Sequence, residues 1–121
     1  MHNARMPFKP AESLLPLTPI SFEILLALHD GELHGYAILQ AVEARLAGRL
    51  PMRTGTIYRA LARLLDEGLI ERSDATADDD PRRRYYAITR LGRETAKAEA
   101  RRLADQVDAA RAHRLLPSVR K

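Results

Sequence analysis

The stretch MRTGTIYRALARLLDEGLI, residues 52–70, decides the fold of this chain. Its apolar side chains recur at helical spacing and form one continuous stripe, which consists of Ile57, Leu61, Leu64 and Leu65. The opposite side of the same helix carries small, hydroxyl-bearing and positively charged residues, namely Thr56, Arg59, Ala60 and Arg63. The pattern predicts a helix that packs on a core with one face and offers the other face to a binding partner.

Two further helices are predicted before this one, and their boundaries follow from capping residues. Thr18 is the expected N-cap of the first helix and Pro19 its first residue, where a missing N–H costs nothing. Gly31 is the expected C-cap of that helix. The second helix is predicted from about residue 35 to residue 46, and Thr54 is the expected N-cap of the third helix.

The hydrophobic period changes from helical to alternating after Gly68. LIERSDAT, residues 69–76, and RRYYAIT, residues 83–89, are predicted to be strands on either side of the polar turn ADDDPR. A long final helix is expected to begin after Thr89 and to continue to about Leu115. This order of elements predicts a mainly α (α+β) chain, a winged helix-turn-helix with a C-terminal dimerisation helix.

The last helix carries small and apolar residues at heptad spacing, in a stripe that is too short to be stable alone. The first helix is apolar nearly all round, so it is expected to be buried on more than one face. We therefore predict a homodimer whose interface contains Phe22, Leu26, Ala96, Ala100, Leu103, Val107 and Ala110. The predicted parts are an N-terminal arm (1–17), the winged helix-turn-helix (18–89), the dimerisation helix (90–116) and a tail (117–121).

In a winged helix-turn-helix, the second helix of the turn motif enters the major groove of DNA. The helix that follows residue 53 is expected to take this role, and the hairpin is expected to reach a neighbouring groove or the backbone. Free N–H groups at Gly55, Thr56 and Ile57 are expected to form an anion site for a phosphate. The predicted partner is double-stranded DNA with a pseudo-palindromic operator, and the predicted DNA-binding residues are Arg53, Thr54, Gly55, Thr56, Tyr58, Arg59, Arg63, Arg82, Arg83 and Arg84.

Some of these residues also have a plainer interpretation. Arg59 and Arg63 would suit a solvated helix face, and Tyr58 would suit partial burial. The run Asp78–Asp80 is unusual for a wing that meets phosphate, and it either points away from DNA or pairs with the arginines after it when DNA is absent. A winged-helix adaptor that binds proteins instead of DNA is the alternative function, and it should show little binding to any duplex.

Composition is compatible with an anionic partner and excludes several classes of protein. The net charge of +4, with far more arginine than lysine, suits such a partner, although a GC-rich codon bias would give the same excess. There is no cysteine, and no stretch approaches the roughly 18 apolar residues of a membrane span. The start MHNARMPFKPAESLLPL has no signal-peptide core, so a cytoplasmic location is expected.

No metal, cofactor or catalytic site is predicted. His29 and His34 flank Glu32 without the spacing of a zinc site, and Asp78–Asp80 lacks the spacing and the glycine of an EF-hand. The sequence has no cysteine nucleophile, no G-x-S-x-G elbow and no glycine-rich phosphate loop. The chain is therefore not expected to be an enzyme.

Three motifs resemble those of the PadR family of bacterial transcriptional regulators, and they occur in that family's order. They are HGYAILQAVEARL, TGTIYRALARLLDEGLIE and PRRRYYAITRLGRE, and the resemblance covers about residues 17–95. It implies a dimeric winged-helix repressor of nearby genes, and it adds a small-molecule effector as a candidate partner. The chain departs from many relatives in having Arg59 where they have proline and RTGT where they have SPGT, so its operator is expected to differ from theirs.

Overall fold

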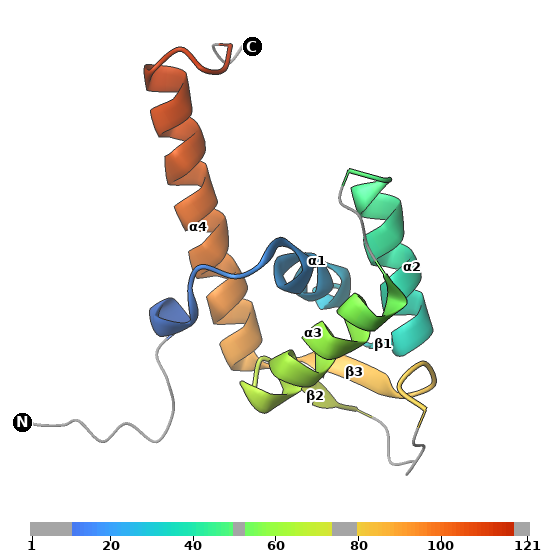
Figure 1. Cartoon of the computed structure of the whole chain (residues 1–121). Helices are drawn as coiled ribbons and strands as arrows, with labels where there is room; N and C mark the ends of the chain where they lie inside the picture. The colour runs from blue at the N-terminus through green and yellow to red at the C-terminus, as the bar shows by residue number, and fades with distance from the viewer. Residues whose placement is uncertain (1–10, 50–52, 74–79, 118–121) are drawn as a thin grey trace, which may run out of the picture.

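The computed structural model describes residues 11–49, 53–73 and 80–117. Short helices and a small sheet form a body beside the N-terminal half of one long helix, α4, which extends beyond that body (Figure 1). This arrangement confirms the predicted mainly helical, winged helix-turn-helix fold. In chain order the elements are η1 (Ala11–Leu14), α1 (Pro19–Leu28), β1 (Leu33–His34), α2 (Gly35–Leu46), α3 (Thr54–Asp66), β2 (Ile70–Arg72), β3 (Tyr85–Ile88) and α4 (Arg90–Ala112).

The core lies among α1, α2 and α3 and is closed by the sheet. The predicted stripe of α3 is confirmed, because Ile57, Leu61 and Leu64 are buried and Leu65 packs against them with part of its surface exposed. The other buried apolar side chains of this core are Ile24, Leu25, Leu28, Ile38, Leu39, Val42, Leu46, Leu69, Ile70 and Tyr86. One face of α3 is thereby fixed, and the opposite face is left at the surface.

β3 is the central strand of a three-stranded antiparallel sheet with the order β1-β3-β2. Ile70 of β2 pairs with Ile88, and Leu33 of β1 pairs with Tyr86. The two predicted strands of the hairpin are present as β2 and β3, and β3 is shorter than predicted, while residues 74–76 of the first predicted strand lie outside the described residues. The sequence does not predict β1, because a strand of 2 residues is too short to show alternation.

Two helices begin where the sequence predicts, with a threonine as the cap. The side chain of Thr18 accepts the N–H of Ser21 at 3.1 Å. The side chain of Thr89 accepts the N–H of Gly92 at 3.0 Å. In both cases the hydroxyl satisfies an N–H group that has no partner inside its own helix.

Three predicted helix boundaries are wrong. Thr54 is the first residue of α3, and Arg53 holds the N-cap position without a side-chain cap, because a guanidinium has no acceptor. α1 ends before Gly31, with His29 as its C-cap, since the N–H of His29 closes a tight turn onto Leu26. α4 ends before the predicted residue because Arg114 takes a left-handed φ of 64°.

A buried carboxylate holds the segment before α1 against α4. Glu99 is only 2% exposed and accepts the N–H of Leu17 at 3.4 Å. Its partner Arg102 lies one helical turn away, with an Nη2–Oε2 distance of 2.7 Å. The hydrogen bond from Arg102 holds the pKa of Glu99 below its usual value against the effect of burial. The predicted arm is therefore anchored at its C-terminal end, and its residues 1–10 lie outside the described residues.

The wing is the hairpin of β2 and β3, and its base is the segment 80–84 just before β3. The start of α2 is bound to this base by main-chain hydrogen bonds. The N–H of Gly35 donates to the carbonyl of Arg84 at 3.0 Å, and the N–H of Tyr36 donates to the carbonyl of Arg82 at 3.1 Å. A Cβ on residue 35 would lie 2.1 Å from the carbonyl oxygen of Pro81, so this approach requires glycine. The wing is thereby held in one position relative to α2.

Replacing Gly35 with alanine is expected to lower the free energy of unfolding by about 3 kcal/mol, because the carbonyl of Pro81 is main chain and cannot turn aside. The matched control is Gly55→Ala, also in the first turn of a helix, where the added methyl meets only the flexible end of Arg59 at 3.1 Å. That control is expected to change the free energy by no more than about 1 kcal/mol. Urea unfolding followed by circular dichroism measures both, and equal losses would contradict the prediction.

Candidate nucleic-acid interface

The side of α3 that faces away from the core carries most of the residues that the sequence predicts for DNA binding. The N–H of Thr56 donates to the carbonyl of Arg53 at 2.9 Å, so it is not free for an anion as predicted. The predicted anion site at the start of α3 therefore has fewer donors than expected. On this side Arg53, Thr54, Gly55, Arg59 and Arg63 are exposed, and Thr56 and Ala60 are partly buried.

The guanidinium of Arg59 folds back over the first turn of α3. Its Nη1 lies 3.1 Å from the position that a Cβ on Gly55 would occupy. The start of a helix already carries partial positive charge from the aligned backbone dipoles. Because the guanidinium adds a full charge at the same place, the start of α3 favours an anionic partner.

Tyr58 lies on the flank of α3, between the core and the wing. Its hydroxyl is buried and has no hydrogen-bond partner among the residues that the structure describes. Burial raises the pKa of Tyr58, whereas the positive charge of Arg82 acts to lower it. The predicted alternative of partial burial therefore fits Tyr58 in the free protein better than an exposed hydroxyl that donates to DNA.

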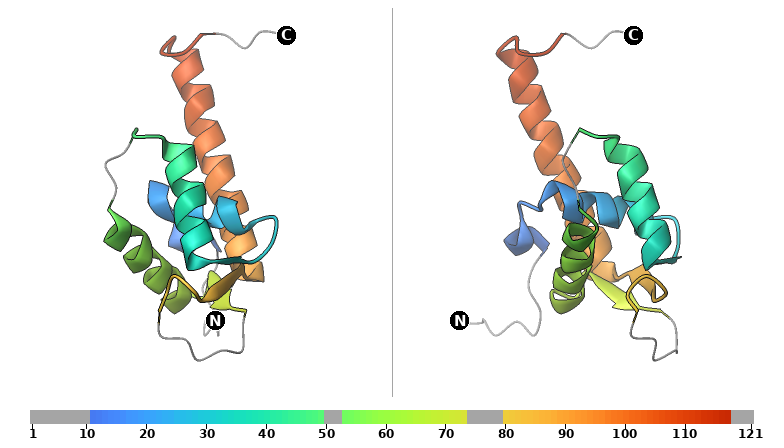
Figure 2. Two further views of the ribbon diagram at one scale, coloured as in Figure 1. Left: turned by 90° about the vertical axis from the view of Figure 1, so that its right-hand side faces the viewer. Right: turned by 45° about the vertical axis from the view of Figure 1, so that its right-hand side comes forward.

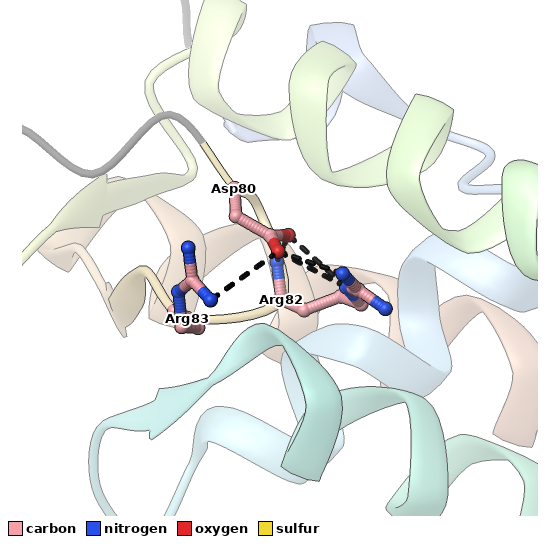
Figure 3. A network of polar contacts seen from close by, with 3 residues as sticks. All are labelled: Asp80, Arg82 and Arg83. Atoms are coloured by element: carbon pink, nitrogen blue, oxygen red, sulfur yellow. Dashed lines mark hydrogen bonds and ion pairs between the residues drawn. The ribbon is translucent and has the colours of Figure 1, made fainter.

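The base of the wing holds an ion-pair cluster that is centred on Asp80 (Figure 3). Nη2 of Arg82 lies 2.8 Å from Oδ2 of Asp80, and Nη1 of Arg83 lies 3.9 Å from the same oxygen. These contacts, led by the side-chain hydrogen bond from Arg82, lower the pKa of Asp80 to about 2. The carboxylate therefore stays ionised at neutral pH. The predicted pairing of the acidic run with the wing arginines is present at Asp80, while Asp78 and Asp79 lie outside the described residues.

A shallow, open depression lies at the junction of the start of α2 and the base of the wing. Nδ1 of His34 accepts the N–H of Ala37 at 3.1 Å, and its ring meets the ring of Tyr85 edge-on at a centroid distance of 5.4 Å. His34 is therefore a helix cap, and residues 11–49, 53–73 and 80–117 hold no group of three or more candidate metal ligands. The depression is lined by His34, Tyr36, Asp80, Arg82, Arg83 and Tyr85.

Three residues of this surface are absent from the set that the sequence predicts. Tyr36 and Tyr85 expose aromatic rings beside the wing arginines, and the HGY and RRRYY motifs that contain them are the available signal. Asp80 is recognisable only as part of an acidic run, because a sequence does not show which carboxylate turns toward the arginines.

Part of the predicted dimer interface comes together in an apolar groove between α1 and α4. Phe22, Leu26, Ala96 and Ala100 line this groove, which has a volume of about 300 Å³. His29, Arg93 and Lys97 complete its lining. Farther along α4, Val107 is exposed, and Leu103 and Ala110 are partly buried. The C-terminal half of α4 stands clear of the body in both views of Figure 2, and within it the side chain of Val107 is exposed.

Solved structures with a similar fold include regulators from three bacteria. A transcriptional regulator from Clostridium thermocellum is 25% identical, with a TM-score of 0.63 over 77% of this chain and 87% of its own. A PadR family transcription regulator from Clostridium difficile is 22% identical, with a TM-score of 0.65 over 79% and 98%. PadR of Bacillus subtilis, solved in complex with operator DNA, is 25% identical, with a TM-score of 0.54 over 73% and 48%.

Among curated proteins, an uncharacterized 37.1 kDa protein in transposon TN4556 of Streptomyces fradiae is 40% identical over 81 residues. The match takes in 67% of this chain and 22% of that protein, so the chain spans less than a quarter of its relative's length. Within the described parts of the chain, every helix is too short or too polar to cross a lipid bilayer.

The model of the transcriptional regulator PadR-like family matches residues 24–98, which include α2, α3 and both wing strands. The chain therefore belongs to the PadR-like family of transcriptional regulators.

Proposed function

We propose that this chain is a sequence-specific DNA-binding regulator that inserts α3 into the major groove and sets the wing against a neighbouring groove or the backbone. The observation that carries the proposal is the division of α3 into two faces. Ile57, Leu61 and Leu64 are buried, whereas Arg59 and Arg63 are exposed one turn apart. Membership of the family supports this function, as does the operator DNA in the complex of the Bacillus subtilis protein.

The proposed regulator acts as a homodimer in the cytoplasm. A second copy of the chain would cover the groove between α1 and α4 and the apolar residues on the free half of α4. Two-fold symmetry would then present two α3 helices to a pseudo-palindromic operator, with half-sites about one turn of DNA, or roughly 34 Å, apart.

The proposed effect on transcription is repression that a small-molecule effector relieves. A dimer that spans an operator occupies DNA which the transcription machinery would otherwise use. The groove of about 300 Å³ between α1 and α4 is the candidate effector site, since its apolar walls and cationic rim suit a small ligand. A ligand there would change how two subunits pack and would thereby change the distance between their α3 helices.

Selection of bound fragments from random duplex DNA tests the proposed function. We expect a pseudo-palindromic consensus, and an affinity that falls steeply as salt is raised. The alternative, an adaptor that binds proteins, would enrich no sequence and would bind duplexes weakly at every salt concentration.

The dimer is tested by Leu103→Glu, which places a charge in the middle of the predicted stripe of α4. We expect the variant to be a monomer or to aggregate in light scattering, because a buried unpaired carboxylate is costly. Ala109→Glu is the control, since residue 109 is exposed and lies outside the stripe. A Leu103→Glu variant that remains a well-folded dimer would show that the interface lies elsewhere.

The wing is tested by the double change of Arg82 and Arg83 to alanine. We expect binding to weaken about equally on all sequences, because these arginines are proposed to contact phosphate or the minor groove. The slope of log K against log salt should become shallower by about 0.9 for each lost phosphate contact. Arg101→Ala on α4 controls for the loss of charge. A changed base preference with an unchanged slope would mean that the wing reads major-groove base edges.

The proposed role of α3 in base recognition is tested by Arg59→Ala and Arg63→Ala, each compared separately with the parent. At least one of the two arginines is expected to read a guanine in each half-site through O6 and N7. Its loss should cost on the order of 1–3 kcal/mol per contact on the selected operator and much less on random duplex. Binding-site selection with each variant provides the measurement. Unchanged base preferences in both variants would refute this role even if affinity fell.

A further inference from the structure

Asp80 holds Arg82 by one edge of its guanidinium. Nε of Arg82 lies 3.1 Å from Oδ1 and 3.3 Å from Oδ2, and Nη2 lies 2.8 Å from Oδ2. The backbone N–H of Arg82 also donates to Oδ1 at 3.0 Å. Figure 3 shows the carboxylate between the two arginine side chains, with Arg82 and Arg83 on opposite sides of it. The orientation of Arg82 is therefore set by several contacts to one carboxylate.

This grip leaves the far end of the Arg82 guanidinium unused. A guanidinium has five N–H donors, and the contacts with Asp80 use those of Nε and one side of Nη2. Within the described parts of the chain, Arg82 makes no side-chain hydrogen bond or ion pair except with Asp80. Both N–H groups of Nη1 and the second one of Nη2 remain, and they point away from the carboxylate.

In this ion pair the side chain of Arg82 is much more exposed to solvent than that of Asp80. The side chain of Arg82 is 62% exposed, whereas that of Asp80 is 20% exposed. An anion that approaches this surface therefore meets the guanidinium before it meets the carboxylate. The guanidinium is the more accessible group of the pair, so the pair can present a cation to DNA without first breaking apart.

The backbone of Arg82 is fixed as well as its side chain. Its carbonyl accepts the N–H of Tyr36 at 3.1 Å, and the N–H of the next residue, Arg83, donates to the carbonyl of Asp80 at 3.0 Å. The preceding residue, Pro81, packs against Gly35 at the start of α2. Both ends of a long and otherwise flexible side chain are thereby ordered before DNA binds.

We propose that Asp80 is a positioning residue for DNA binding, and that it holds Arg82 edge-on so that the free end of the guanidinium donates to the duplex while the ion pair stays intact. The inference rests on the proposed function. End-on donation by two N–H groups is how arginine binds both phosphate oxygens and the acceptors of a base edge, and it does not need the edge that Asp80 occupies. Ordering the side chain in advance removes part of the entropy cost of the contact.

The opposite role for Asp80 makes a contrary prediction. A carboxylate that competes with phosphate for Arg82 would weaken DNA binding, so its removal would strengthen binding. Loss of one negative charge from a DNA-binding surface also strengthens binding in general. A positioning role is therefore supported only if the removal of Asp80 weakens binding against this trend.

A double-mutant cycle separates the two roles. Asp80→Ala, Arg82→Ala and the double variant of the full chain are titrated with a duplex that the parent selects from random DNA. We expect Asp80→Ala to bind about three- to tenfold more weakly than the parent, as for the loss of order in one long side chain. In the Arg82→Ala background, the same change should leave affinity unaltered or raise it. Glu71→Gln, an exposed carboxylate on β2, reports the general effect of removing one charge.

Two further readouts distinguish positioning from a purely structural effect. Asp80→Asn keeps an acceptor for the backbone N–H of Arg82 but loses the charged grip, and it is expected to bind as weakly as Asp80→Ala. The salt slope of both variants should become shallower by about 0.9 if the contact of Arg82 with a phosphate is lost. Parental affinity in Asp80→Asn, or stronger binding and a steeper slope in Asp80→Ala, would overturn the inference. A parent that binds no duplex would overturn the proposed function itself.

Discussion

The main-chain hydrogen bonds between the start of α2 and the base of the wing are the constraint on which the proposed interface depends. They join the N–H groups of Gly35 and Tyr36 to the carbonyls of Arg84 and Arg82. The same bonds satisfy N–H groups that a helix start leaves unpaired, and they tie the segment before β3 to α2. Because Pro81 fills the space where a side chain on Gly35 would stand, the position of the wing is set by backbone.

Because the wing is fixed, the positive charges of the wing and of α3 have fixed positions relative to each other. One positive centre lies at the start of α3, where Arg59 folds over Gly55. The other lies at the wing base, where the exposed guanidinium of Arg82 pairs with the carboxylate of Asp80. The buried hydroxyl of Tyr58 lies where the charge of Arg82 still acts on it. Since α3 also packs against β2, the two positive centres are held in a fixed arrangement relative to each other.

Much of this fold could be predicted from the sequence because it rests on periodicity and capping. The stripe of α3 and the caps Thr18 and Thr89 follow from local rules that the tertiary structure leaves intact. The cap at Thr54 could not be predicted correctly, because Arg53 takes the cap position although its side chain has no acceptor. β1 is missing from the prediction since its two residues become a strand only by pairing with β3.

In the candidate site too, some residues could be predicted from local sequence patterns and others could not. Exposure of Arg59 and Arg63 follows directly from the helical period, once the opposite stripe is assigned to the core. The roles of Asp80 and Tyr58 depend on how the wing meets α2 and α3, and no local pattern encodes such a meeting of distant segments. A run of aspartates beside a run of arginines predicts pairing in general, whereas the edge-on geometry of one pair is a property of the folded wing.

α1 links the proposed DNA-binding side to the proposed dimer face. Ile24, Leu25 and Leu28 are buried in the core that supports α3, whereas Phe22 and Leu26 line the groove with α4. Since protein cores are close-packed, a subunit or ligand that moves α1 at the groove must also shift or strain the core face of the same helix. That face packs directly against α3 in the same core. This short path is the physical reason to expect that occupation of the groove alters how α3 meets an operator.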